Sequence, residues 1–152
     1  MNNVPLDYAL ARLTALKIIK LNERLYSLNI TDSFVEEMVK EVKDKFGNLP
    51  LKVQFEIFDF MHLTLRIDGI SSLILFGSYA KLIYSDKSDI DIAVVFENVI
   101  ELGDEKKIEK IAEKISKEFR KEIQVHFFKG KDMKHKEDPL IKDILKNRRV
   151  LV

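Results

Sequence analysis

The chain has 152 residues, 46% of them apolar, which predicts one compact domain with a core of its own and a small appendage. Its 26 basic and 25 acidic residues nearly balance, which argues against a general nucleic-acid or membrane-surface binder. The absence of cysteine excludes disulfides, thiolate zinc sites and cysteine nucleophiles. Without a signal peptide or an apolar run of about 20 residues, we expect a soluble cytoplasmic protein. The dominance of Lys and Glu among the charged residues is typical of thermophile proteins.

Residues 1–67 predict an N-terminal helical extension. Apolar residues recur at steps of three and four over 6–28, which predicts a first helix. A second helix is expected over 33–46, where Ser33 and Glu36 have the spacing of a capping box.

The segment 49–67 fits two interpretations. Val53, Phe55 and Ile57 alternate with other residues, as they would in a strand. The polar residues favour a helix instead, because they recur at steps of three and four and would gather on one face: Glu56, Asp59, His62 and Arg66. We therefore expect a third helix, which packs on the sheet that follows.

From residue 68 onward, strand and helix patterns alternate. Short apolar runs predict strands at 72–76, 89–96 and 122–128. Helices are expected at 79–83, 104–121 and 139–146. This order predicts an α/β (α+β) fold, with a small mixed sheet flanked by helices.

Two acidic residues begin the strand at 89–96. Side chains alternate along a strand, so Asp89 and Asp91 emerge together while Ile90 and Ile92 face the core. Two neighbouring carboxylates repel each other unless a cation lies between them, and Mg²⁺ is commonly held by one or two carboxylates and phosphate oxygens. An Asp-x-Asp pair alone is common by chance, so this pattern needs a second feature to indicate a site.

The Gly-Ser pair that ends the preceding strand provides that feature. Gly77 has no Cβ, so a phosphate could approach its backbone closely, and a turn from strand to helix presents free N–H groups to an anion. Ser78 adds a hydroxyl donor. Together, these residues predict a triphosphate held between the Gly-Ser turn and a metal ion on two aspartates.

The combination of strand, Gly-Ser, ten residues, Asp-x-Asp and strand resembles the signature of the nucleotidyltransferase superfamily related to DNA polymerase β. The stretches "FGSYAK" and "SDIDIAVVF" are similar to the minimal nucleotidyltransferases of bacteria and archaea, and "PLIKDILKNRRVLV" is similar to their C-terminal tail. The resemblance implies a nucleotidyltransferase domain over 68–152, after an extension over 1–67.

The resemblance also implies roles for individual residues. Asp89 and Asp91 would be catalytic and bind Mg²⁺, and Gly77 and Ser78 would hold the nucleotide phosphates. Lys81 stands where many members have an arginine and would keep a positive charge near the phosphates. ATP would be the donor and AMP the transferred group.

The chain departs from the family pattern at the third acid, which usually assists deprotonation of the acceptor hydroxyl. Its expected place is Gln124, which cannot act as a base and is a poor metal ligand. Glu122 and His126 would lie on the same face and could substitute. For each of these two, a structural role is the simpler alternative.

Two classes of function remain open at this point. The resemblance implies an antitoxin that attaches AMP to a tyrosine of a HEPN-domain toxin, with the N-terminal helices docking the partner or mediating homo-oligomers. The alternative is a catalytically weak or inactive module that binds a nucleotide or a partner. The basic residues near the C-terminus alternate with acids and lack aromatic neighbours, which favours a solvated surface over a nucleic-acid site.

Overall fold

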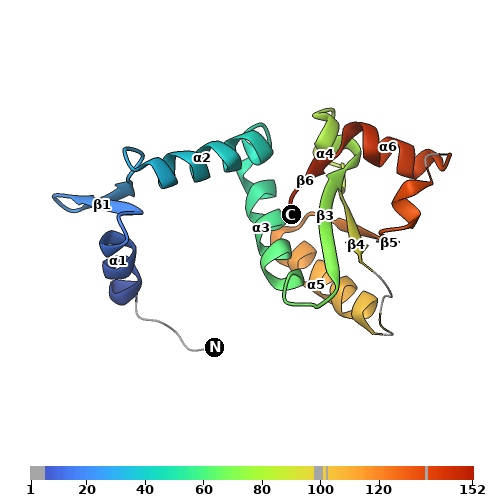
Figure 1. Cartoon of the computed structure of the whole chain (residues 1–152), viewed down its shortest axis with the longest axis horizontal. Helices are drawn as coiled ribbons and strands as arrows, with labels where there is room; N and C mark the ends of the chain where they lie inside the picture. The colour runs from blue at the N-terminus through green and yellow to red at the C-terminus, as the bar shows by residue number, and fades with distance from the viewer. Residues whose placement is uncertain (1–5, 98–100, 102, 136) are drawn as a thin grey trace. The chain divides into compact units, whose positions relative to one another are not determined.

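The computed structural model describes residues 6–97, 101, 103–135 and 137–152 (Figure 1). By packing, the chain divides into two compact units, Met1–Gly47 and Asn48–Val152. The third helix, which the sequence assigned to the extension, belongs to the second unit. The functional domain boundary after residue 67 stays a prediction. Within the described ranges, none of the helices is both long and apolar enough to cross a membrane.

The first unit contains a β-hairpin that the sequence analysis did not predict. The expected helix over 6–28 is wrong beyond Ala15, where α1 (Leu6–Ala15) ends. Lys17 has a positive φ of 57°, which takes the chain out of the helix, and β1 (Ile19–Asn22) and β2 (Leu25–Leu28) then pair antiparallel. Apolar residues at 19, 21, 26 and 28 share one face of this hairpin, so the apolar spacing that suggested a helix also suits two short strands.

The helix expected over 33–46 is confirmed as α2 (Ser33–Phe46), but its cap differs. The carboxylate of Asp32 accepts hydrogen bonds from the backbone N–H groups of Phe34 and Val35, at 3.1 and 3.4 Å. The residue that caps the helix is therefore Asp32 and not Ser33, because Ser33 is already the first residue of the helix and Asp32 directly precedes it.

The second unit has the predicted alternation of strands and helices. Its elements are α3 (Leu51–Thr64), β3 (Ile70–Phe76), α4 (Gly77–Lys81), β4 (Ile90–Phe96), α5 (Asp104–Phe119), β5 (Ile123–Lys129), the 3₁₀ turn η1 (Asp132–Lys134), α6 (Pro139–Asn147) and β6 (Arg149–Val150). The sheet order is β5-β4-β3-β6, with β4 and β5 parallel and the other neighbours antiparallel. This confirms the expected α/β class with a mixed sheet, to which the chain end adds the unpredicted strand β6.

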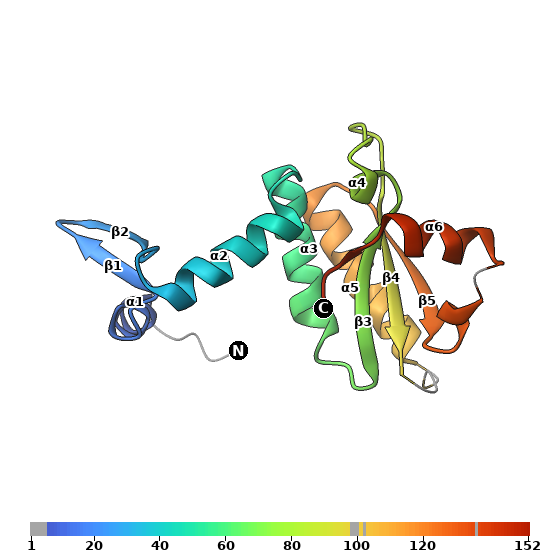
Figure 2. The ribbon, with the colours of Figure 1, turned by 45° about the horizontal axis from the view of Figure 1, so that its top comes forward.

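Different helices pack on the two faces of the sheet of the second unit (Figure 2). On one face, Ile74, Phe76 and Ala93 form a buried cluster with Ile144 of α6. The residues that alternate with them, such as Leu73 and Leu75, point to the opposite face, where α5 packs on β5 and α3 packs on α5. Because Asp91 follows the same alternation as Ala93, it lies on the α6 face of the sheet.

Candidate functional site

The turn from β3 into α4 lies directly against the acidic end of β4. Phe76 pairs with Asp91 in the sheet, and the next residue, Gly77, has a φ of +68°. A Cβ built on Gly77 would overlap the Asp91 carboxylate. Glycine is therefore required here both by the backbone conformation and by the close approach of the acid.

Asp91 is half-buried at the start of β4 and is surrounded by charged groups. Burial raises the pKa of the Asp91 carboxyl above its ordinary value, because it removes water from the charged form. The positive charge on His126 lowers this pKa, the negative charge on Asp89 raises it, and Lys81 lowers it. The predicted pair of acids therefore lies close enough to His126 and Lys81 for their charges to interact.

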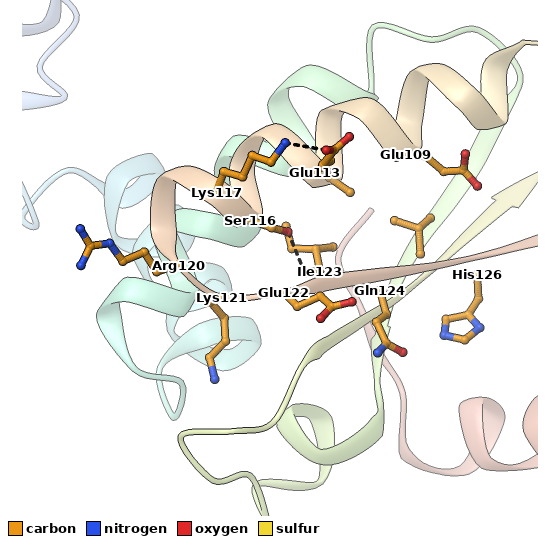
Figure 3. A pocket seen from close by; sticks show the side chains of 12 residues that line it. Glu109, Glu113, Ser116, Lys117, Arg120, Lys121, Glu122, Ile123, Gln124 and His126 are labelled. Atoms are coloured by element: carbon orange, nitrogen blue, oxygen red, sulfur yellow. Dashed lines mark hydrogen bonds and ion pairs between the residues drawn. The ribbon is translucent and has the colours of Figure 1, made fainter.

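Strand β5 supplies an amide where the family pattern places an acid. Gln124 pairs with Asp91 in the parallel ladder, and its Nε2 donates a hydrogen bond of 2.9 Å to Oδ2 of Asp89. In Figure 3, the side chains of Gln124 and His126 point to the same side of β5, away from α5. The His126 ring contacts the edge of the Phe76 ring, with 5.1 Å between centroids. Sequence reasoning thus placed Gln124 correctly beside the two acids.

Two other candidates from the sequence have contacts that the sequence did not predict. Nζ of Lys81 forms an ion pair of 2.7 Å with Asp143 of α6, and this hydrogen bond lowers the pKa of Asp143. The backbone N–H of Ile90 donates to the carbonyl of Glu122 at 2.8 Å, while the side chain of Glu122 is exposed. Lys81 is consequently held by α6, and Glu122 has a backbone role in the sheet.

Sequence reasoning missed three polar residues around the site. Asp143 holds Lys81, and Nζ of Lys121 donates to the carbonyls of Asp86 and Ser88, both at 2.7 Å. Glu56, which helical spacing assigned to a polar face, is fully buried. The contacts of Asp143 and Lys121 join distant parts of the chain, and the burial of Glu56 depends on how α3 packs, so no local spacing in the sequence indicates these features.

The pair of aspartates fits a magnesium ion of the kind that the resemblance implies. Among the residues that the structure describes, no group of three or more His, Asp or Glu side chains could hold a metal. A nucleotide-bound Mg²⁺ needs fewer, since one or two carboxylates suffice when phosphates and water supply the other oxygens. Asp89 and Asp91 provide hard oxygen ligands beside a turn with no Cβ in the way, which meets this requirement.

A groove of about 700 Å³ adjoins the third strand of the site. It is lined by α5 and by the first half of β5, including Gln124 and His126 (Figure 3). The groove lies on the α5 side of β5, whereas the side chains of Gln124 and His126 point away from α5 (Figure 3).

The chain was compared with protein-family models, curated proteins and solved structures. Residues 62–152, more than half of the chain, match the family described as "Polymerase beta, Nucleotidyltransferase". A crystal structure of a toxin-antitoxin with AMP-PNP is 18% identical, covering 64% of this chain and 71% of that one, with a TM-score of 0.47. A candidate nucleotidyltransferase from Sulfolobus solfataricus is 19% identical over 65% of this chain and 84% of its own, with a TM-score of 0.37. No curated protein sequence matches the chain significantly.

Proposed function

Because the chain belongs to the polymerase β nucleotidyltransferase family, we propose that it transfers a nucleoside monophosphate, AMP from ATP, to an acceptor hydroxyl with the help of Mg²⁺. One observation carries the proposal. The Gly77 turn meets the Asp91 carboxylate so closely that no side chain fits between them. The turn proposed to bind phosphate and the acid proposed to bind the metal therefore lie side by side.

In this proposal, Asp89 and Asp91 hold the magnesium ion. When bound, the ion would orient the α-phosphate and neutralise charge on the departing pyrophosphate. The backbone at Gly77 and the hydroxyl of Ser78 hold the outer phosphates. Lys81 also contributes a positive charge, but the phosphates must compete for it with Asp143, its ion-pair partner at 2.7 Å.

The acceptor hydroxyl has to lose a proton during transfer. Gln124 has no basic group, and its amide is already hydrogen-bonded to Asp89. His126 is the better-supported base, because a neutral imidazole can accept a proton and its side chain lies on the same face of the sheet as Asp91 (Figure 3). Glu122 is the second choice, since its carboxylate is exposed at the beginning of the strand.

For the acceptor, we propose a tyrosine of a HEPN-domain toxin. This step rests on the similarity of "FGSYAK" and "SDIDIAVVF" to minimal nucleotidyltransferases that act as antitoxins. The first unit supports a protein partner, because Phe34, Met38 and Val42 of α2 follow one another at helical spacing and are exposed. Self-association through the same segment stays a prediction.

A second candidate function is a module that binds a nucleotide or a partner without transfer. The observation that favours it is the hydrogen bond from Gln124 to Asp89, which puts a neutral amide where a third acid would act. Such a module would need the aspartates for MgATP but would move no label.

The test uses labelled ATP, Mg²⁺ and the protein encoded by the neighbouring gene. We expect label on the neighbour with the wild-type chain and none with Asp89→Asn plus Asp91→Asn. Asp86→Asn, an exposed aspartate in the same loop, is the matched control and should transfer normally. Transfer that survives in the double variant would refute the site, and Mg²⁺-dependent ATP binding without transfer would favour the second candidate.

A further inference from the structure

Lys121 connects the end of α5 to the loop that precedes the two aspartates. Its Nζ donates to the carbonyls of Asp86 and Ser88, each at 2.7 Å. The loop has a turn of its own, in which the Ser88 N–H donates to the Ser85 carbonyl at 3.0 Å and the Ser85 N–H donates to the Ser88 hydroxyl at 2.9 Å. One ammonium group therefore binds this turn at two successive points, immediately before Asp89.

The same ammonium group also contacts α4, the helix that begins with the Gly-Ser pair. Nζ of Lys121 lies 5.5 Å from the centroid of the Tyr79 ring, a distance at which a cation is attracted to an aromatic face. Tyr79 is 2% exposed and stacks on Tyr84 with 4.5 Å between centroids. Lys121 thus contacts both the predicted phosphate-binding helix and the loop before the predicted metal-binding acids.

A buried carboxyl group provides a third interaction for Lys121. Glu56 of α3 is fully buried, and neither of its carboxyl oxygens has a hydrogen-bond partner. The charge of Lys121 acts on Glu56, together with that of Lys52. The buried carboxyl group of Glu56 thus adds an electrostatic interaction to the hydrogen bonds of the same lysine.

From these contacts we infer that Lys121 is a positioning residue for the metal site. It fixes the loop over 84–88 against α4, and so sets where the Asp89 carboxylate stands relative to Asp91 and the Gly77 turn. In Figure 3 its side chain extends to the same side of β5 as Gln124, which is bonded to Asp89. This inference rests on the proposed function, because it assigns Lys121 a role in a site that binds Mg²⁺ and ATP.

The test measures ATP binding by calorimetry at increasing Mg²⁺ concentrations. Lys121→Met keeps the apolar stem and removes the charge, and we expect the half-saturating Mg²⁺ concentration to rise roughly 10- to 100-fold, as for other residues that orient metal ligands. Lys121→Arg should restore most of the affinity. Lys117→Met removes an exposed lysine near the end of α5 that pairs only with Glu113 among the described residues, and it should change nothing.

A second measurement separates positioning from a general structural role. Amide hydrogen exchange over 84–90 should become faster in Lys121→Met and in the milder Lys121→Gln, while the core strands keep their protection. A lower melting temperature with unchanged Mg²⁺ dependence and unchanged exchange over 84–90 would overturn the inference. If Lys121→Met does not fold, the Mg²⁺ dependence and the exchange over 84–90 of Lys121→Gln test the inference instead.

The outcomes also distinguish this inference from the proposed function. If Asp89→Asn removes Mg²⁺-dependent ATP binding while Lys121→Met and Lys121→Gln bind normally, only the role of Lys121 is refuted. If the wild-type chain shows no Mg²⁺-dependent ATP binding, the proposed function fails, and with it the role of Lys121 in a metal site.

Discussion

The two units of the chain differ in how much apolar surface they bury. In the first unit, Val35 and Phe46 are the buried apolar side chains among the described residues, and every residue of β2 is exposed. In the second unit, six of the seven residues of β4 are buried. Burial of apolar area is the main favourable term in folding, so the second unit has a fold specified by its own core. The secondary structure of the first unit depends mostly on local interactions.

The largest expected contrast comes from two phenylalanines, one in each unit. Phe60 of α3 is fully buried, so Phe60→Ala should lower the free energy of unfolding by about 3–5 kcal/mol, through lost burial and the cavity left behind. Phe34 of α2 is 64% exposed, so Phe34→Ala should change it by less than about 0.5 kcal/mol. Urea unfolding of both variants measures the difference. A large loss in Phe34→Ala would mean that association covers α2 in solution.

The same difference explains how far the sequence predicted the fold. The strand expected at 89–96 is confirmed as β4, because a nearly continuous apolar run has few alternatives to a buried strand. The helix expected over 6–28 is wrong after Ala15, because side chains that stay exposed select neither a helical nor a strand period. The spacing of apolar residues indicates secondary structure because one face of the element is buried. In a segment without a buried face, this spacing predicts little.

In the site, the features that local patterns or the family resemblance indicate were predicted, and the contacts that depend on the packing of other elements were not. The alternation of Asp89 with apolar residues and the glycine that begins α4 are local patterns, and the structure brings Gly77 and Asp91 together. The pairing of Lys81 with Asp143 comes from the packing of α6. Similarly, helical spacing placed Glu56 on a polar face of the helix, but the structure shows that its side chain is fully buried.

Glu56 gives the second contrast, in the pH dependence of stability. Burial raises the pKa of Glu56 from 4.5 to about 7, although Lys52 and Lys121 lower it. Between these values the folded protein holds a proton that the unfolded chain has released. The contribution of Glu56 to the free energy of unfolding should therefore be largest below about pH 4.5, fall as the pH rises to about 7 and then level off.

Replacement of Glu56 by its neutral isostere should remove this dependence. Relative to the wild type, Glu56→Gln should be of equal stability near pH 4.5 and more stable at pH 8 by on the order of 1–3 kcal/mol. Glu37→Gln changes an exposed glutamate of α2 and should leave the curve within about 0.5 kcal/mol. Urea unfolding at a series of pH values measures both, and parallel curves for Glu56→Gln and the wild type would contradict the assignment.

The smallest contrast comes from two helix caps of the same design. Asp138 accepts from the N–H groups of Leu140 and Ile141 at the start of α6, as Asp32 does at the start of α2. Loss of either cap costs about 1 kcal/mol of helix stability. Because Ile144 of α6 belongs to the core of the sheet, Asp138→Ala should lower the free energy of global unfolding by that amount.

Asp32→Ala should instead act only on its own helix. It should speed hydrogen exchange in the first turn of α2 and leave the main unfolding transition in place, because α2 belongs to the first unit, which buries few apolar side chains. An equal loss of global stability in both variants would show that the two units unfold together. The first unit would then depend on the second for its fold. In that case, the exposure of its side chains alone would no longer explain why the sequence analysis did not predict the β1–β2 hairpin.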